Sequence, residues 1–126
     1  MIIGIVGSRR RDSEADYKLC EEAFLKIYKE GDIIVSGGCR QGGDRFAEII
    51  RDKFKVPMEI HYPDKSKLDP VKMEKNIKWA YAEINYARNT LIANDADVII
   101  AVVAPDRKGG TEDTLKKAKG KPVILV

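Results

Sequence analysis

Short apolar runs alternate with longer amphipathic segments along the whole chain. The apolar runs are rich in β-branched residues and end at Gly, Pro or Asp, which is typical of buried parallel strands. We expect five strands, at residues 2–6, 33–35, 58–61, 98–103 and 123–126.

The segments between these runs carry apolar residues three and four positions apart, the spacing of one helix face. This spacing predicts helices at 16–29, at 43 or 44 to 54, at 70 to about 93, and at 111–119. Asp12 or Ser13 is expected to cap the first helix, and a loop at 62–70 is expected to precede the third.

Crossovers of this length imply parallel pairing, because the chain must return across the sheet between neighbouring strands. The 126 residues, 44% of them hydrophobic, fit one domain with a single core. The predicted fold is α/β: a single Rossmann-like three-layer α/β/α sandwich over residues 1–126, with a five-stranded, mainly parallel sheet.

Ligands of such folds bind beyond the carboxyl ends of the strands, where the strand order reverses. The glycine-rich segments of the chain all follow predicted strands, so we expect them on that one edge of the sheet. They begin with Gly7, Ser8 and Arg9, continue through 36–44 and finish at Gly109, Gly110 and Thr111.

The loop at 36–44 resembles a phosphate cradle because Ser36 and four glycines precede a helix. Glycines let backbone amides approach one point, and a helix N-terminus favours an anion. The alternative is a tight turn without a ligand. The glycines are Gly37, Gly38, Gly42 and Gly43.

The other two glycine loops have alternatives of the same kind. Ser8 and Arg9 suit a phosphate, or belong to a solvated basic loop. Gly109, Gly110 and Thr111 suit an anion at a helix start, or form a flexible turn with a helix cap.

Asp44, at the start of the second predicted helix, has three interpretations. It caps the helix, holds a ribose hydroxyl, or orders the glycine-rich loop. Cys39 lies in the same loop, but no histidine partner for covalent catalysis follows from the sequence.

The motifs in order resemble those of the SLOG superfamily. They are Gly7-Ser8-Arg9, Ser36-Gly37-Gly38 with Gly42-Gly43-Asp44-Arg45, Arg88-Asn89 before an apolar strand, and Gly109-Gly110-Thr111. That superfamily groups the DNA processing protein A, Lonely Guy and YspA/YpsA-like families. The resemblance spans most of the chain and implies a Rossmann-like domain that binds a nucleotide or a nucleotide derivative, with these residues as its site.

The chain departs from the Lonely Guy signature, whose glutamate serves hydrolysis of the base–ribose bond. Thr114 stands where that glutamate belongs, and Glu112 and Asp113 would point elsewhere on the helix. An N-glycosidic hydrolase or transferase, with Asp44, Glu112 or Asp113 as its carboxylate, remains an alternative function. Binding of single-stranded DNA in the DNA processing manner is another, which a net charge of only +3 supports weakly.

It is not evident from the sequence that Arg88 and Asn89 can reach the ligand-binding edge of the sheet. A helix from Arg88 to the fourth strand covers about 10 Å, whereas the strand spans about 20 Å. We expect either the long Arg88 side chain or a break near Tyr86 to bring this motif to the ligand edge; the alternative is a surface arginine paired with a carboxylate.

Composition narrows the possible location, metal content and oligomeric state of the protein. No run has the ~18 apolar residues of a membrane helix, and no leader precedes the first strand, so we expect a cytoplasmic protein. Two cysteines and one histidine give no metal-binding spacing, so no metal is predicted. The aromatic residues of the third crossover, Trp79, Tyr81 and Tyr86, suggest a homodimer contact.

Overall fold

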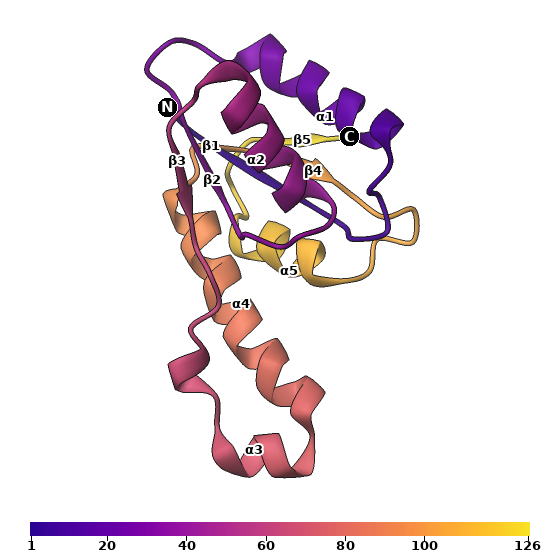
Figure 1. The fold of residues 1–126 in the computed structure, drawn as a ribbon, viewed down its shortest axis with the longest axis vertical. Coiled ribbons are helices and arrows are strands. Elements are labelled where there is room, and N and C mark those ends of the chain that lie inside the picture. Colours follow the sequence, from indigo (N-terminus) through magenta and orange to yellow (C-terminus); the bar gives the residue numbers. More distant parts are fainter.

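Five strands form one sheet in the order β3-β2-β1-β4-β5 in the computed structural model, which describes residues 1–126 (Figure 1). The strands are β1 (Ile2–Gly7), β2 (Ile33–Ser36), β3 (Met58–Ile60), β4 (Val98–Val102) and β5 (Val123–Leu125). Every neighbouring pair is parallel. The chain adds strands to one side of β1 and then to the other, so the order reverses between β1 and β4. The predicted Rossmann-like α/β architecture is confirmed.

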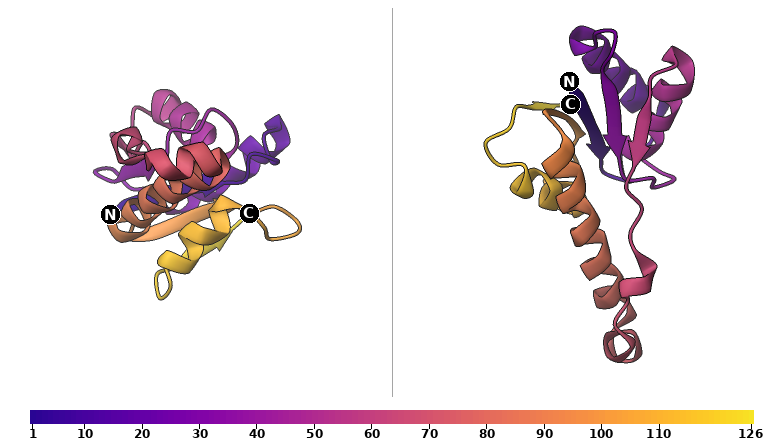
Figure 2. Two further views of the ribbon diagram at one scale, coloured as in Figure 1. Left: turned by 90° about the horizontal axis from the view of Figure 1, so that it is seen from below. Right: turned by 90° about the vertical axis from the view of Figure 1, so that its left-hand side faces the viewer.

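Helices cover both faces of the sheet, as the two views in Figure 2 show. Helices α1 (Glu14–Ile27) and α2 (Gly43–Phe54) bury Phe24 and Phe46 against Ile5 of β1. Helices α4 (Ile77–Asp95) and α5 (Gly110–Lys117) cover the other face, where Ile92 packs with Val6. Ile5 and Val6 thus face opposite layers, as successive residues of a strand must.

Helix α1 begins at Ser13, one of its two predicted caps. The Ser13 hydroxyl accepts a hydrogen bond from the Asp16 amide, and the Asp16 carboxylate accepts one from the Ser13 amide. This reciprocal pair is a capping box. Asp12, the other predicted cap, instead contacts the start of α2.

The third crossover contains two helices after a short 3-10 turn, η1 (Lys65–Lys67), and the prediction of one helix from 70 to 93 is wrong at Asn76. Helix α3 (Pro70–Lys75) ends there, and α4 begins at the next residue. The extended backbone of Asn76 breaks the helix, and its side chain accepts a hydrogen bond from the Trp79 amide.

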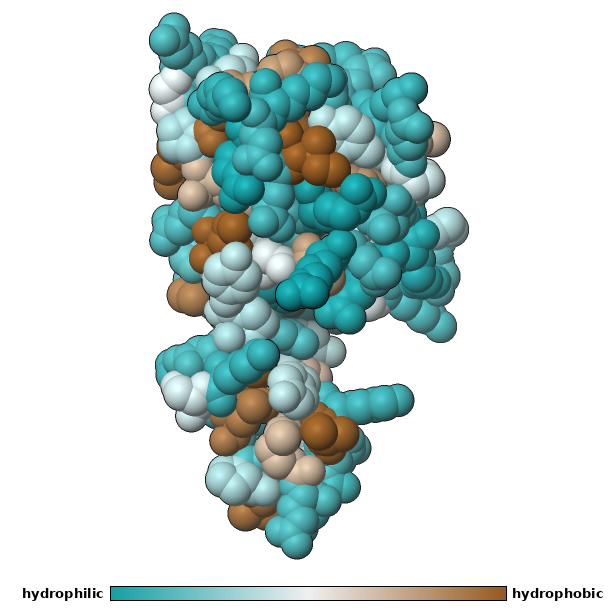
Figure 3. Space-filling view, in the orientation of Figure 1, coloured by the Kyte–Doolittle hydropathy of each residue, from teal (hydrophilic) through white to brown (hydrophobic).

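Helix α4 is longer than the strands, so its first half projects beyond the carboxyl edge of the sheet together with η1 and α3 (Figures 1 and 2). We call this projection the arm. Brown apolar groups gather on it among polar ones in Figure 3. Val71, Ile77 and Trp79 are all more than half exposed there.

None of the helices combines the length and the apolar character that crossing a bilayer requires.

Candidate ligand-binding site

A pocket of about 510 Å³ opens at the carboxyl edge of the sheet, at the point where the strand order reverses. Its walls are the loop after β1, the inner face of α4, and the loop that leads into α5. The lining residues are Val6–Arg10, Cys39, Asp44, Ala82, Asn85, Tyr86, Arg88, Asn89, Ile92, Lys108–Thr111 and Thr114.

The pocket contains some of the predicted site residues and leaves others out. Those that line it are Gly7, Ser8, Arg9, Asp44, Arg88, Asn89, Gly109, Gly110 and Thr111. Those that do not are Ser36, Gly37, Gly38, Gly42 and Gly43. Sequence reasoning missed the α4 wall, Ala82, Asn85 and Tyr86. Only their helical spacing before Asn89 marks them in the sequence.

Gly110, the first residue of α5, has open space around it. It has no left-handed backbone angle, and a Cβ added there would meet no atom within 4 Å. Each of the other nine glycines has either a positive φ or a close neighbour. The amides of Gly110 and Thr111 belong to the first turn of α5, so they have no acceptor within the helix. Neither packing nor backbone conformation requires glycine at this position.

The glycine-rich loop at 36–44 is packed against the protein itself. A Cβ on Gly43 would collide with the backbone of Val6 and Gly7, and one on Gly42 would collide with the Ser8 carbonyl. A Cβ on Gly37 would meet the side chains of Arg88 and Asp44, and Gly38 has a φ of +73°. Packing and backbone conformation account for all four glycines, and a phosphate-binding role for them stays a prediction.

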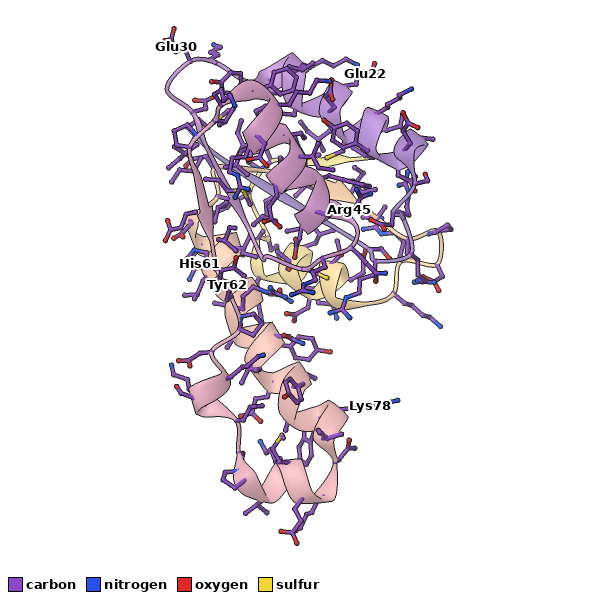
Figure 4. The ribbon with its side chains drawn as sticks, in the orientation of Figure 1. Glu22, Glu30, Arg45, His61, Tyr62 and Lys78 are labelled. Atoms are coloured by element: carbon purple, nitrogen blue, oxygen red, sulfur yellow. The ribbon has the colours of Figure 1, made fainter.

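The N-terminus of α2 already has an anion beside it. The Asp12 carboxylate accepts a hydrogen bond from the Gly42 amide at 2.7 Å and one from the Arg45 Nε at 2.8 Å. Arg45 lies on the first turn of α2 and is labelled in Figure 4. The Gly42 amide, helped by Arg45, lowers the pKa of Asp12. A side chain of the protein therefore already accepts a hydrogen bond from the N-cap amide of this helix.

Asp44 lies at the floor of the pocket, 8% exposed. Its Oδ2 accepts a hydrogen bond from the Cys39 amide at 3.1 Å, and its Oδ1 lies 2.9 Å from the Ser36 hydroxyl. The helix-cap interpretation is wrong, because Gly42 is the N-cap and the Asp44 side chain turns back toward the loop. Asp44 orders the loop instead.

Burial raises the pKa of Asp44, although the Cys39 amide, Ser36 and Arg88 oppose that rise. The hydrogen bonds agree with a protonated carboxyl. Ser36 has one hydroxyl proton, and its oxygen lies 2.5 Å from the Ile5 carbonyl, which can only accept. If Ser36 donates its only proton to the Ile5 carbonyl, its oxygen can only accept from Asp44. The Asp44 carboxyl must then carry a proton on Oδ1 and donate it to the Ser36 oxygen.

Arg88 and Asn89 connect α4 to two glycine loops. Arg88 donates to the Gly37 carbonyl at 2.5 Å and to the Asn89 Oδ1 at 2.9 Å. The Asn89 amide donates to the Gly110 carbonyl at 3.3 Å and to Asp113 at 3.1 Å. Helix α4 runs unbroken through Tyr86, so the long Arg88 side chain spans the gap.

Cations surround the mouth of the pocket. Arg10 is committed to Asp106, with contacts of 2.6 and 2.8 Å. The side chains of Arg9 and Lys108 make no hydrogen bond or ion pair within the chain and line the same mouth. An anionic ligand would meet two uncommitted positive charges there.

Among the carboxylates considered for catalysis, only Asp44 lines the pocket. Glu112 pairs with Arg107 at 2.9 Å, and Asp113 pairs with Lys117 at 2.9 Å.

One group of side chains has the composition of a metal site, and it lies outside the pocket. Glu59, His61 and Asp95 place one ligand atom each within 4.8 Å of one another. His61 follows β3 near the base of the arm (Figure 4), and its Nε2 lies 2.6 Å from the Asp95 Oδ2. That direct contact pairs the imidazole and the carboxylate without an ion.

No protein-family model matches the chain, and no curated protein matches it in sequence. Among solved structures, it is similar to the molybdenum cofactor binding protein from the phototrophic bacterium Rippkaea orientalis. The TM-score is 0.69 and the identity 24%, over 98% of this chain and 74% of that one. This likeness shows the fold, a Rossmann-like sandwich of parallel strands. Membership of the SLOG superfamily stays a prediction.

Proposed function

We propose that the chain binds a small phosphate-bearing ligand, a nucleotide or a nucleotide-like cofactor, with its phosphate on the first turn of α5. Gly110 carries the proposal. A glycine that neither packing nor conformation requires lies beside free helix amides, facing the pocket. Such a glycine lets a phosphate come within hydrogen-bonding distance of the backbone.

Four further observations support the same ligand class. The pocket lies at the reversal of strand order, where α/β sheets bind ligands. Its volume is within the range of about 300–1,000 Å³ that small-molecule sites have. Arg9 and Lys108 supply charge for an anion. The similar solved protein is a cofactor-binding protein, which agrees with a small molecule as the ligand.

The test is Gly110→Ala, with Lys116→Ala, an exposed change on the same helix, as the matched control. Thermal melting and calorimetry would measure binding of AMP, cyclic nucleotides, NAD, ADP-ribose and a molybdenum cofactor preparation, alongside mass spectrometry of co-purifying molecules. Alanine suits a helix start, so the unliganded variant should be as stable as the wild type or up to about 1 kcal/mol more stable.

We expect Gly110→Ala to weaken ligand binding about tenfold or more, and Lys116→Ala to leave it unchanged. The affinity loss corresponds to about 1.4 kcal/mol, the value of one displaced phosphate hydrogen bond. Absence of any bound or co-purifying phosphate compound would overturn the proposal, and so would equal affinity in Gly110→Ala.

We also propose that the arm mediates a homodimer. It extends away from the sheet and exposes Val71, Ile77 and Trp79, large apolar side chains that gain from burial against another surface. Light scattering after size exclusion should give twice the 14.1 kDa chain mass. Trp79→Ser should shift the mass toward the monomer, whereas Leu19→Ser, a similarly exposed apolar site on α1, should not. A monomeric wild type at high concentration contradicts this proposal.

A further inference from the structure

The pocket continues from the start of α5 along one face of α4. Ala82, Asn85 and Asn89 line it at positions three and four residues apart, which lie on the same side of a helix. Asn89 touches Gly110, at the proposed phosphate end. Asn85 lies one turn further toward the arm, about 6 Å along the helix axis. The wall therefore reaches well beyond what a phosphate alone needs.

The two asparagines differ in what their amides contact. Asn89 is buried, and three hydrogen bonds occupy its amide, to Arg88, Gly110 and Asp113. Asn85 is half-buried in the same pocket, and its side chain makes no hydrogen bond within the chain. Its carbonyl and its NH₂ group are both available to a ligand.

The neighbours of Asn85 suit a flat group. Ala82, one turn before it, has the smallest side chain that a helix wall can present without glycine. Tyr86 is the aromatic residue of the lining, and Lys117 holds it by donating to its carbonyl at 2.5 Å. A small side chain at Ala82 leaves room for a planar ring system beside Asn85.

We propose that this end of the pocket binds the heterocyclic base of the ligand, with the Asn85 amide reading its edge. A carboxamide presents a donor beside an acceptor, which matches the adjacent donor and acceptor on the edge of a nucleobase. The ligand class is then a base-bearing phosphate, such as a nucleoside monophosphate, and excludes a plain sugar phosphate. This inference rests on the phosphate site at Gly110.

The experiment compares two kinds of probe by calorimetry: the nucleoside monophosphates AMP, GMP, CMP and UMP, and ribose 5-phosphate, which has no base. The test variants are Asn85→Leu, which removes the amide at similar volume, and Ala82→Leu, which fills the space for the ring. The matched controls on the same helix are Asn94→Leu and Ala87→Leu, at exposed positions outside this pocket. Thermal melting checks that each variant is folded.

We expect the wild type to bind at least one nucleoside monophosphate more tightly than ribose 5-phosphate. Asn85→Leu should weaken that nucleotide about tenfold, because two neutral hydrogen bonds are lost. Ala82→Leu should weaken it at least as much, while ribose 5-phosphate binding stays unchanged in both. Asn85→Gln keeps the amide and should recover part of the affinity.

Two results would overturn the inference alone. One is equal wild-type affinity for ribose 5-phosphate and every nucleotide; the other is a nucleotide affinity that Asn85→Leu and Ala82→Leu leave unchanged. In both, binding that still weakens in Gly110→Ala leaves the phosphate site intact. No binding of any of the five compounds, together with no co-purifying phosphate compound, overturns the phosphate site, and the base site with it.

Discussion

Replacing Asp44 by asparagine should test whether the buried carboxyl of this residue holds a proton in the folded protein. The introduced carboxamide reproduces a protonated carboxyl: its oxygen accepts from the Cys39 amide, and its NH₂ donates to Ser36. Asp44→Asn should therefore fold with a stability close to that of the wild type. Asp44→Ala leaves both partners without their hydrogen bond, and we expect it to lose about 2–4 kcal/mol of unfolding free energy.

The pH dependence gives the sharper measurement. Because the pKa of folded Asp44 is raised above the unfolded value, the folded state holds this proton more tightly. The contribution of Asp44 to stability is then complete below the unfolded pKa of about 3.9, and it is lost as pH rises toward the folded pKa. The slope in that window reaches at most about 1.4 kcal/mol per pH unit. Asp44→Asn has no such loss.

Urea unfolding of both proteins at pH 4 to 8 measures the difference. The variant should gain stability relative to the wild type as pH rises, and the gain should level off above the folded pKa of Asp44. The reasoning is refuted if the variant instead loses stability relative to the wild type at neutral pH. That result would mean that Asp44 is ionised and that its attraction to Arg88 exceeds the cost of burial.

Three further substitutions test the packing around the pocket. Asp12→Asn should show the opposite pH dependence, because the pKa of Asp12 is lowered in the folded protein. In urea unfolding, the variant should lose about 0.5–1 kcal/mol of unfolding free energy at pH 7, and this difference should vanish as acid protonates wild-type Asp12. Gly43→Ala should lose about 2 kcal/mol or more of unfolding free energy and melt at a clearly lower temperature, since its Cβ has no space beside the β1 backbone. An unchanged melting temperature would contradict the packing described. Asn89→Ala should cost about 1–3 kcal/mol in urea unfolding, because it leaves Arg88 and Gly110 short of a partner, and it should also weaken any ligand whose binding depends on Gly110.

Most of the fold could be predicted from the sequence because each strand is a short β-branched run and each helix has an apolar stripe. All five strands lie within one or two residues of their expected bounds. The break at Asn76 could not be predicted in this way, because residues on both sides continue a helical pattern. It depends on the extended backbone of Asn76 and on its side chain capping the next helix. The free energy of such a side-chain cap is small, about 1 kcal/mol, so the choice between a cap and a continuous helix is not visible in the sequence pattern.

The candidate site was predictable at the level of loops, since the carboxyl ends of parallel strands meet at one edge. The role of each residue within those loops was not. Arg88 illustrates the difference: its motif indicates a site residue, and it lines the pocket, but its guanidinium also holds the Gly37 carbonyl. Such a contact joins residues 51 positions apart. It depends on how α4 crosses the sheet, which no local pattern records.

The two Gly-Gly pairs at helix starts are alike in composition but differ in their surroundings. Gly42-Gly43 and Gly109-Gly110 both start a helix at the same edge of the sheet. The first pair is pressed against β1, and the carboxylate of Asp12 bonds to its amide; the second pair faces open space. A side chain at Gly43 would therefore damage the fold, whereas one at Gly110 would obstruct only what enters the pocket. If Gly43→Ala loses stability, and Gly110→Ala keeps its stability but loses ligand affinity, the anion binds at the start of α5, although the loop with more glycines precedes α2.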